Sequence, residues 1–365
     1  MKKLLIPLLL LCILLAGCGR RTPTEATSVP ASITPEPTSG IGHFPTPNAP
    51  SVPESITGNY LYSASLSEED TPAVLQSNSR IDELLPYLKS ELRSLRLELS
   101  SAEEIGGIFR LNNSHGLQAS LTDRQAAMVM LGLTLSEQTG GAFDLTDEPL
   151  RLLWNISEED SLPTEEAIAA ARALCDYRTL LLTVNTLSYS SDDIMLDTES
   201  YLAGYCIDVL ATAIGEAGID SASLCIDNTA YYREADENAA AAVSLHSYKA
   251  DGEFPVCTLY CRNYAVSGAH RALYSKSIEH TQVHPYLDLR TGRPSEQDYL
   301  SVFVLSPSAA LAQITAKACY SRSPEEGNTM LSEIPDTYAI YVLTDGSIYC
   351  TDGLTDRFAV SFAER

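Results

Sequence analysis

Apolar residues recur at intervals of three and four along several stretches of the chain, a spacing that places them on one face of a helix. The first stretch covers residues 81–99, where Pro86 marks either the start of the helix or a kink in it. Its apolar face holds five leucines: Leu84, Leu85, Leu88, Leu92 and Leu95. A second helix is predicted from Thr122, a good N-cap, to the Gly140–Gly141 pair.

Three further helices are predicted downstream. One runs from Thr164 to about Cys175. Another begins with Ser200 as its N-cap and stops at Gly218. Its apolar face consists of Leu202, Cys206, Val209, Leu210 and Ile214. The last begins at Ser306–Pro307, which suit the N-cap and the first helical position. Its apolar face consists of Leu311, Ile314, Ala318 and Cys319.

Segments rich in β-branched and apolar residues predict strands between these helices. They lie at residues 179–185, 193–197, 222–227, 256–261 and 299–306. A further segment, YAIYVLTDGSIYCTDG, predicts a hairpin with Asp345–Gly346 in a two-residue turn. Helices and hairpin-linked strands alternate in blocks, without regular βαβ units. The predicted fold class is therefore α+β, with mainly antiparallel sheets packed with helices.

The first residues carry a pattern typical of exported bacterial lipoproteins. Two lysines precede an apolar run from Leu4 to Leu15, which is too short for an ordinary transmembrane helix. The sequence LAGC that follows resembles a lipobox, in which the cysteine receives the lipid. We therefore expect residues 1–17 to be a signal peptide and Cys18 to be lipidated. A plain secretion signal is the alternative interpretation.

Residues 18–57 are rich in Pro, Thr and Ser and contain few large apolar side chains, so they cannot bury enough surface to fold alone. We expect them to form a tether between the lipid on Cys18 and one folded domain over residues 58–365. This arrangement predicts a protein anchored by lipid at the extracytoplasmic face of the cell membrane.

Charge and cysteine content narrow the possible functions. The formal net charge is -24, and such an acidic surface repels phosphate backbones, so we do not expect nucleic-acid binding. The chain has nine cysteines but no CxxC pair, which argues against zinc ribbons and thioredoxin-like redox motifs. Cys206 and Cys319 are predicted to be buried thiols, and the sequence assigns no disulfide.

Six short motifs follow one another along the chain. They are RLNN at 110–113, EQTGGAFDLT at 137–146, DTESYLAGYCID at 197–208, AVSGAHR at 265–271, HPYLDLRTGRP at 284–294 and LAQITAKAC at 311–319. In order and spacing they resemble the FAD:protein FMN transferase family, the ApbE-type flavin transferases, from about Leu99 to the C-terminus. The resemblance implies an ApbE-like flavin transferase fold. Family members cleave FAD with Mg²⁺ and transfer FMN to a Thr or Ser of a partner protein.

The resemblance also assigns residues to a flavin site. It places Asp144 and Thr146 in the flavin pocket and Ser267 and Gly268 near the cofactor. His284 is the best basic candidate for catalysis. For Asp144, an alternative is a purely local turn after the preceding helix ends.

The chain departs from the family pattern where ligand contacts are expected. Glu199 and Ser200 replace a glycine pair, and Ala203 replaces a lysine. Gln313 replaces an acidic metal ligand and Lys317 replaces a threonine. Neither replacement suits Mg²⁺, so no retained metal site is expected.

Further departures follow the same trend. Asn228–Thr229 replaces a second glycine pair, Val266 replaces a threonine, and Pro285 replaces a histidine. Lys317 has two interpretations: its ammonium substitutes for Mg²⁺ beside a diphosphate, or it points to solvent.

These observations leave three hypotheses for function. The first is a membrane-anchored FAD:protein FMN transferase-like lipoprotein with impaired or lost activity. Its partner would be an extracytoplasmic flavinylated redox protein. The second is a non-catalytic scaffold that binds a flavin or a partner. The third is a lipoprotein that kept the fold and binds an unrelated ligand.

Overall fold

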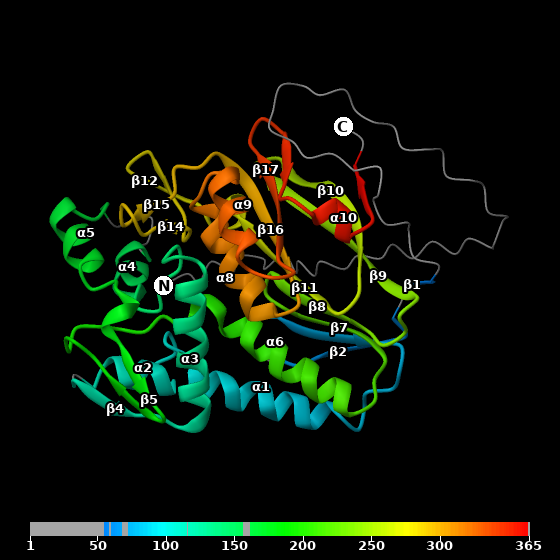
Figure 1. Ribbon diagram of the computed structural model, residues 1–365, viewed down its shortest axis with the longest axis horizontal. Helices are drawn as coiled ribbons and strands as arrows, with labels where there is room; N and C mark the ends of the chain where they lie inside the picture. The colour runs from blue at the N-terminus through cyan, green and yellow to red at the C-terminus, as the bar shows by residue number, and fades with distance from the viewer. Residues whose placement is uncertain (1–54, 58–59, 68–71, 115, 156–160, 364–365) are drawn as a thin grey trace, which may run out of the picture.

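The computed structural model describes residues 55–57, 60–67, 72–114, 116–155 and 161–363, which form three layers (Figure 1). The middle layer is an eight-stranded antiparallel sheet with the order β18-β17-β16-β11-β8-β7-β3-β2. Its strands are β2 (Tyr62–Ser65), β3 (Ala73–Ser77), β7 (Ser221–Ile226), β8 (Thr229–Glu234), β11 (Tyr264–His270), β16 (Tyr299–Ser306), β17 (Tyr338–Leu343) and β18 (Ile348–Cys350).

A four-stranded sheet covers one face of this middle layer, in the order β1-β9-β10-β19. Its strands are β1 (Ser55–Thr57), β9 (Ala239–Lys249), β10 (Gly252–Cys261) and β19 (Val360–Phe362). Apolar residues that alternate along both sheets pack between them and form one core cluster, which includes Val243, Leu259, Val266, Leu305 and Val342.

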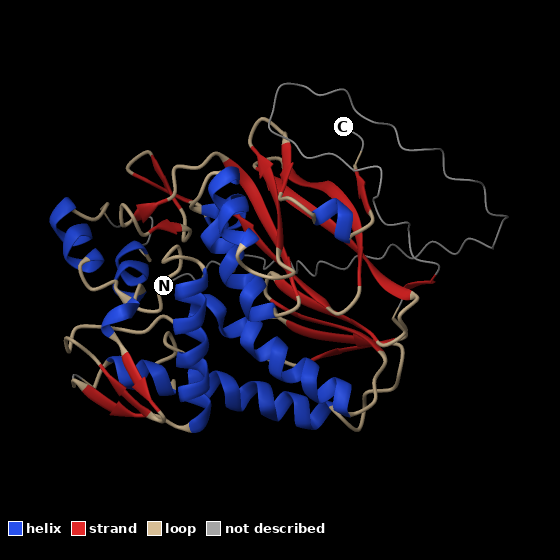
Figure 2. Ribbon diagram, viewed as in Figure 1, coloured by secondary structure: helices blue, strands red, loops and turns tan. Residues whose placement is uncertain are grey.

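Helices cover the opposite face (Figure 2). Three of them pack closely together, with α6 (Glu199–Glu216) between α1 (Leu85–Leu99) and α8 (Ala309–Tyr320). The other helices are α2 (Gly107–Asn112), α3 (Asp123–Gln138), α4 (Glu148–Trp154), α5 (Glu165–Arg172), α7 (Arg271–Tyr274), α9 (Pro324–Ser332) and α10 (Leu354–Arg357). The small sheets are β4 (Gln118–Ser120) with β6 (Thr186–Ser188) and β5 (Leu181–Thr183), β12 (Lys276–Ile278) with β13 (Thr281–Val283), and β14 (Leu287–Asp288) with β15 (Arg293–Pro294).

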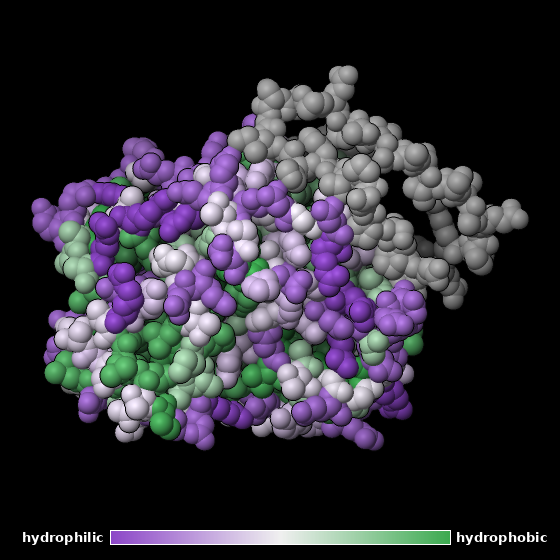
Figure 3. All heavy atoms as spheres, viewed as in Figure 1, coloured by the Kyte–Doolittle hydropathy of each residue, from purple (hydrophilic) through white to green (hydrophobic). Residues whose placement is uncertain are grey.

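The face seen in Figure 3 mixes polar and apolar side chains, and apolar ones gather at its lower left corner. Exposed apolar side chains at the β4-β6-β5 sheet include Leu117, Leu181 and Val184. No helix in the described residues combines the length and the apolarity needed to cross a membrane. The predicted signal peptide, Cys18 and most of the predicted tether lie outside the described residues. The last three residues of that predicted tether form β1, which pairs in parallel with β9.

The predicted α+β class is confirmed, and so are the helices that rest on apolar spacing. Pro86 stands in the first turn of α1, so it starts the helix instead of kinking it. Thr122 caps α3 in a capping box with Gln125. Thr164 caps α5, which ends at Arg172, slightly before the predicted end. Cys206 and Cys319 are buried as predicted, and no disulfide joins any two of the described cysteines.

Two predicted helix starts were wrong. Ser200 lies inside the first turn of α6, and the N-cap is Thr198. Ser306 is still the last residue of β16, and Ser308 caps α8 by accepting a hydrogen bond from the N–H of Leu311. A carboxylate decides where each helix begins: the nearby Asp197 at α6 and the distant Asp208 at α8.

Three predicted β features also needed correction. Residues 179–185 do not form one strand, because the chain turns at Val184, whose φ of 54° reverses it into β6. Residues 193–197 form no strand, because the side-chain amide of Asn112 satisfies both backbone groups of Leu196. The β17–β18 hairpin is present, but Gly346 donates to the carbonyl of Leu343 and closes a loop longer than two residues.

The contact between α6 and α8 is the closest helix packing around the site. A Cβ at Gly204 would lie 2.5 Å from the carbonyl oxygen of Ala309 and 2.6 Å from the Cα of Ala310, so only glycine allows this approach. The carboxylate of Asp208 then accepts hydrogen bonds from the N–H groups of Ala309 and Ala310 at 2.7 and 3.1 Å. It also accepts one from the hydroxyl of Ser308 at 2.7 Å. The side chain of Asp208 thus caps α8 from α6.

We expect Gly204→Ala to lower the free energy of unfolding by about 2 kcal/mol, because the added methyl overlaps backbone that cannot move aside. Urea unfolding followed by circular dichroism measures the change. Gly215→Ala, in the same helix, is the matched control. There the atoms nearest to a new Cβ belong to the side-chain end of Arg233, at 3.0 Å or more, and not to backbone. The control variant should be as stable as the wild type or up to about 1 kcal/mol more stable. Equal losses in both variants would contradict the packing described here.

Candidate functional site

Six charged side chains gather where α4, α6 and α8 meet, and we call them the charged cluster. They are Asp147, Glu148, Arg151, Asp197, Glu199 and Lys317. Asp197 lies just before α6 and is fully buried. Its carboxylate accepts hydrogen bonds from the N–H of Ser200, at 3.0 Å, and from the Ser200 hydroxyl. Asp197 therefore satisfies the first turn of α6, a role that the sequence predicted for Ser200.

Asp147 and Asp197 form a carboxyl pair at the centre of the cluster. Burial, followed by the charge of Asp197 and a hydrogen bond with it, holds the pKa of Asp147 well above its usual range. The Oδ1 atom of Asp147 is buried and has no hydrogen-bond partner among the described residues. Two like charges this close disfavour a second ionisation, so the pair retains a proton more strongly than two separate carboxyls do.

Glu148 and Arg151 form the second part of the cluster, on the first turn of α4. The guanidinium of Arg151 binds the Glu148 carboxylate through two nitrogens, with Nε 2.6 Å from Oε2. The same Nε lies 3.8 Å from Asp197. Burial raises the pKa of Glu148 to about 7, Arg151 opposes that shift, and the charges of Asp197 and Glu199 add to it. Arg151 is thus committed largely to Glu148.

Glu199 is held by the loop that follows α1. Its Oε1 accepts hydrogen bonds from the Ser100 hydroxyl at 2.5 Å and from the N–H groups of Ser101 and Ala102 at 3.1 and 3.4 Å. This carboxylate therefore does not project freely into open space. The carboxylate already uses these three hydrogen-bond donors, so an anion from outside the chain cannot bind them unless Glu199 moves away.

Lys317 faces the charged cluster from α8. Burial lowers its pKa, and the negative charges of Asp197, Asp147 and Glu199 raise it in opposition. No hydrogen bond or ion pair joins its ammonium to another residue in the part of the chain that the structure describes. Lys317 as a whole is half-buried, but its ammonium is buried beside the carboxyl groups of Asp197, Asp147 and Glu199, so it does not simply point to bulk solvent.

The residues present do not fit Mg²⁺ at the two positions that the resemblance assigns to it. The Oε1 atom of Gln313 already accepts a hydrogen bond from the N–H of Gly204 at 2.7 Å. Lys317 carries hydrogen-bond donors and no acceptor. Among the described residues, no group of three or more His, Cys, Asp or Glu side chains is arranged to hold a metal ion.

Asp144 and Thr146 lie beside the charged cluster but are tied to each other. The Asp144 Oδ1 accepts hydrogen bonds from the N–H and the hydroxyl of Thr146 at 2.8 and 2.6 Å. Its Oδ2 accepts one from the N–H of Tyr177 at 3.0 Å. Gly140 and Gly141, both at positive φ, end α3 just before this turn. The geometry therefore includes the local turn that was the alternative interpretation of Asp144. Contact of these residues with flavin stays a prediction.

Ser267 and Gly268 lie on β11, next to the turn that joins β7 and β8. The Ser267 hydroxyl is 2.8 Å from that of Thr229, and both are buried. The N–H of Gly268 donates to the carbonyl of Asn228 at 3.0 Å. A Cβ at Gly268 would overlap the imidazole of His270, so the ring fills the space that a side chain would need. These residues support the turn at Asn228, and their contact with flavin stays a prediction.

His284 is buried between aromatic rings. Its Nε2 lies 3.1 Å from the carbonyl oxygen of Ser295, and its Nδ1 is buried without a partner among the described residues. The rings of Tyr286 and Tyr320 lie 5.6 Å from it, centre to centre. Burial lowers the pKa of His284 to about 4, so the imidazole is neutral at physiological pH. A neutral imidazole retains the capacity to accept a proton, but its basicity is low.

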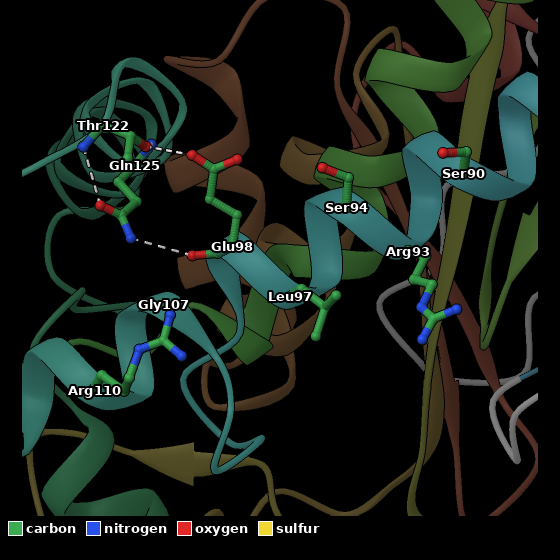
Figure 4. Close-up of a pocket in the computed structure, with 9 residues that line it drawn as sticks. All are labelled: Ser90, Arg93, Ser94, Leu97, Glu98, Gly107, Arg110, Thr122 and Gln125. Carbon is green, nitrogen blue, oxygen red and sulfur yellow. Dashed lines mark hydrogen bonds between the residues drawn. The ribbon is translucent and has the colours of Figure 1, made fainter.

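A separate groove of about 520 Å³ lies between α1, α2 and the start of α3 (Figure 4). Arg93 and Arg110 project toward its open space, and Glu98 is bound to Thr122 and Gln125 at its far side. Arg110, the first residue of the RLNN motif, contributes to its lining. The residues of the charged cluster do not line this groove.

Sequence reasoning missed three residues of the cluster: Asp147, Glu148 and Arg151. One signal was available, because Glu148 and Arg151 stand three residues apart in DEPLRLLW, a spacing that pairs side chains on a helix. Nothing local identified their partner Asp197, which comes from another element.

Comparison with known sequences points to one family. The sequence model of the ApbE family matches residues 69–342. A FAD:protein FMN transferase of Treponema pallidum (strain Nichols) is 24% identical over 289 residues, which cover 74% of this chain and 79% of the relative. One of Escherichia coli (strain K12) is 23% identical over 276 residues, covering 73% and 78%.

Solved structures share the fold. The flavin transferase ApbE from Vibrio cholerae superposes with a TM-score of 0.69 at 19% identity, covering 82% of this chain and 98% of that one. The flavinyl transferase ApbE from Pseudomonas stutzeri, in its apo form, gives 0.68 at 21% identity, covering 83% and 94%. The fold predicted from the motifs is therefore confirmed.

The raised pKa of Glu148 predicts a pH dependence of stability. The folded state favours the protonated carboxyl, so this contribution is complete below the unfolded value of 4.5 and is lost as pH rises through about 7. We expect the free energy of unfolding of Glu148→Gln, relative to wild type, to rise by about 2.5 kcal/mol between pH 5 and pH 8.

Urea unfolding at several pH values across that range measures the difference. Glu104→Gln, at an exposed glutamate outside the cluster, is the control and should follow the wild-type curve. If Glu148→Gln also runs parallel to wild type, Glu148 does not titrate in the folded state as described.

Proposed function

This chain belongs to the ApbE family, and from that membership we propose that it is a lipid-anchored FAD:protein FMN transferase-like protein with impaired or lost transfer activity. The relatives at about a quarter identity are named FAD:protein FMN transferases, which makes FAD the first ligand to test. The site proposed for it is the region of the charged cluster between α6, α8 and the loop after α1.

The observation that carries the proposal is the position of Glu199. Its carboxylate already accepts the donors of Ser100, Ser101 and Ala102. A diphosphate would have to displace this carboxylate from its donors and would then lie beside a negative charge. Both steps weaken binding of an anionic ligand at this place.

The balance of charge in the cluster supports the same conclusion. Four of the six side chains of the cluster are acidic, burial and the neighbouring Asp197 hold the pKa of Asp147 well above its usual range, and Arg151 is bound to Glu148. Within the cluster, Lys317 is the second cation beside Arg151, and it faces the carboxyl groups of Asp147, Asp197 and Glu199. Catalysis of phosphoryl-type transfer depends on positive charge at the phosphates, and this cluster supplies little.

Export and anchoring complete the proposal. The lipobox-like LAGC before residue 19 and the tether-like composition up to residue 57 support attachment through Cys18 at the extracytoplasmic face of the membrane. The partner class is an extracytoplasmic redox protein that carries FMN on Thr or Ser. A second function, a scaffold that binds flavin or that partner without transfer, is favoured by the low positive charge of the cluster, which argues against catalysis of transfer.

We expect the full-length protein, purified in detergent, to label an acceptor protein with FMN at a rate at least about 100-fold below that of an active relative. The reaction contains FAD and Mg²⁺, and in-gel flavin fluorescence reports the product. The Escherichia coli relative serves as positive control, and an acceptor with its Thr changed to Ala serves as negative control. Labelling at the rate of the relative would overturn the proposed loss of activity. Bound FAD without labelling would select the scaffold.

We expect Cys18→Ser to move the protein from the membrane fraction to the soluble fraction, because the substitution removes the thiol that would carry the lipid. Fractionation with immunoblotting measures the distribution, and incorporation of labelled palmitate measures acylation. Cys12→Ser, which changes a cysteine inside the signal-like segment, is the matched control and should remain in the membrane fraction. If Cys18→Ser also remains there with its label, the anchor is not at Cys18.

A further inference from the structure

We propose that the ammonium of Lys317 supplies, within the charged cluster, the positive charge for which the ApbE family uses a divalent cation, so that this chain takes up no Mg²⁺ there. The inference rests on the proposed function in one respect, since it assigns the charged cluster to the family's site. It goes further by stating how the chain itself offsets the negative charge of the cluster.

The packing of α8 on α6 determines where Lys317 lies. The two helices run antiparallel in a register set by two contacts: Asp208 binds the N–H of Ala309, and the N–H of Gly204 binds Gln313. One turn earlier in α6 and one turn later in α8, the next facing pair is Ser200 and Lys317. Lys317 thus lies opposite the first turn of α6.

That first turn is where the carboxylates converge. Ser200 is bound to Asp197, and Glu199 is its neighbour in the chain. Asp147 lies against Asp197. Arg151 also approaches this turn, with its Nε 3.8 Å from Asp197, but its guanidinium is bound through two nitrogens to Glu148. Buried carboxylates with too little positive charge beside them are costly, so the lysine has a defined electrostatic role in the fold.

Lys317 and a bound Mg²⁺ exclude each other at this place. Mg²⁺ requires an octahedral set of oxygen ligands, whereas an ammonium offers donors and repels a second cation. The nearest alternative ligand on α8, the Gln313 oxygen, is already bonded to Gly204. The chain therefore carries its own cation and lacks, among its described residues, the acceptors that would hold a metal.

The test measures thermal unfolding of the full-length protein in detergent, with EDTA or with Mg²⁺ up to about 10 mM. The wild type is compared with Lys317→Thr, which restores the residue type that the family resemblance assigns to this position. Lys89→Thr is the matched control, because it also changes lysine to threonine within a helix and lies in α1 outside the cluster.

We expect the Tm of the wild type to be the same with EDTA and with Mg²⁺. We expect Lys317→Thr to lose about 5 °C or more in EDTA, while Lys89→Thr keeps the wild-type Tm. A saturable rise of the wild-type Tm with Mg²⁺ would overturn the inference. So would a Lys317→Thr variant as stable as Lys89→Thr in EDTA.

A second pair of variants covers the case in which Lys317→Thr does not fold. Lys317→Arg keeps the charge and should fold, and Lys317→Gln removes it and should be much less stable. Equal stability of these two variants would overturn the inference. The experiment contains no flavin and no acceptor, so its outcome is independent of the labelling assay, and the two proposals can fail separately.

Discussion

The close approach of α6 and α8 is the contact on which the candidate site depends. Gly204 lets the helix backbones meet, and the carboxylate of Asp208 satisfies the first N–H groups of α8. Together they set both the distance and the register of the two helices. Lys317 and the carboxylates at the start of α6 come together only because that register is fixed. The presence of Gly204 and Asp208 in α6 is thus explained by packing and capping.

Sequence predicted the parts of the fold that depend on local periodicity. The apolar spacing of α1, the N-cap Thr122 of α3 and the whole of β16 were predicted correctly, because a helical period, a capping residue and a short run of β-branched and apolar residues are all local signals. Errors came where a distant side chain decides the outcome. Ser306 and Ser308 are equally good caps by type, and the carboxylate of Asp208 makes the second the start of α8. Val184 adopts a positive φ that β-branched residues rarely take, so the turn there had no local signal.

The candidate site was only partly predictable for the same reason. Motif order identified the region, and the substitutions at Glu199 and Lys317 identified its departure from the family. Sequence could not show that Glu199 bonds to the loop after α1, nor that Lys317 faces inward, because both facts depend on how separate helices are oriented. Asp147 was missed because its altered pKa arises from burial and from Asp197, fifty residues further along the chain.

The cap that Asp208 places on α8 has a consequence for folding order. The hydroxyl of Ser308 and its acceptor Asp208 are 100 residues apart in sequence, so the contact closes a long loop and forms late. During synthesis from the N-terminus, α6 and its carboxylates leave the ribosome well before Lys317 does. Until α8 docks, mutual repulsion keeps those carboxylates hydrated and opposes their burial. We therefore expect the docking of α8 to bury the cluster and neutralise it in a single cooperative event, which makes the part of the chain from α8 onward the segment that commits the domain to its native state.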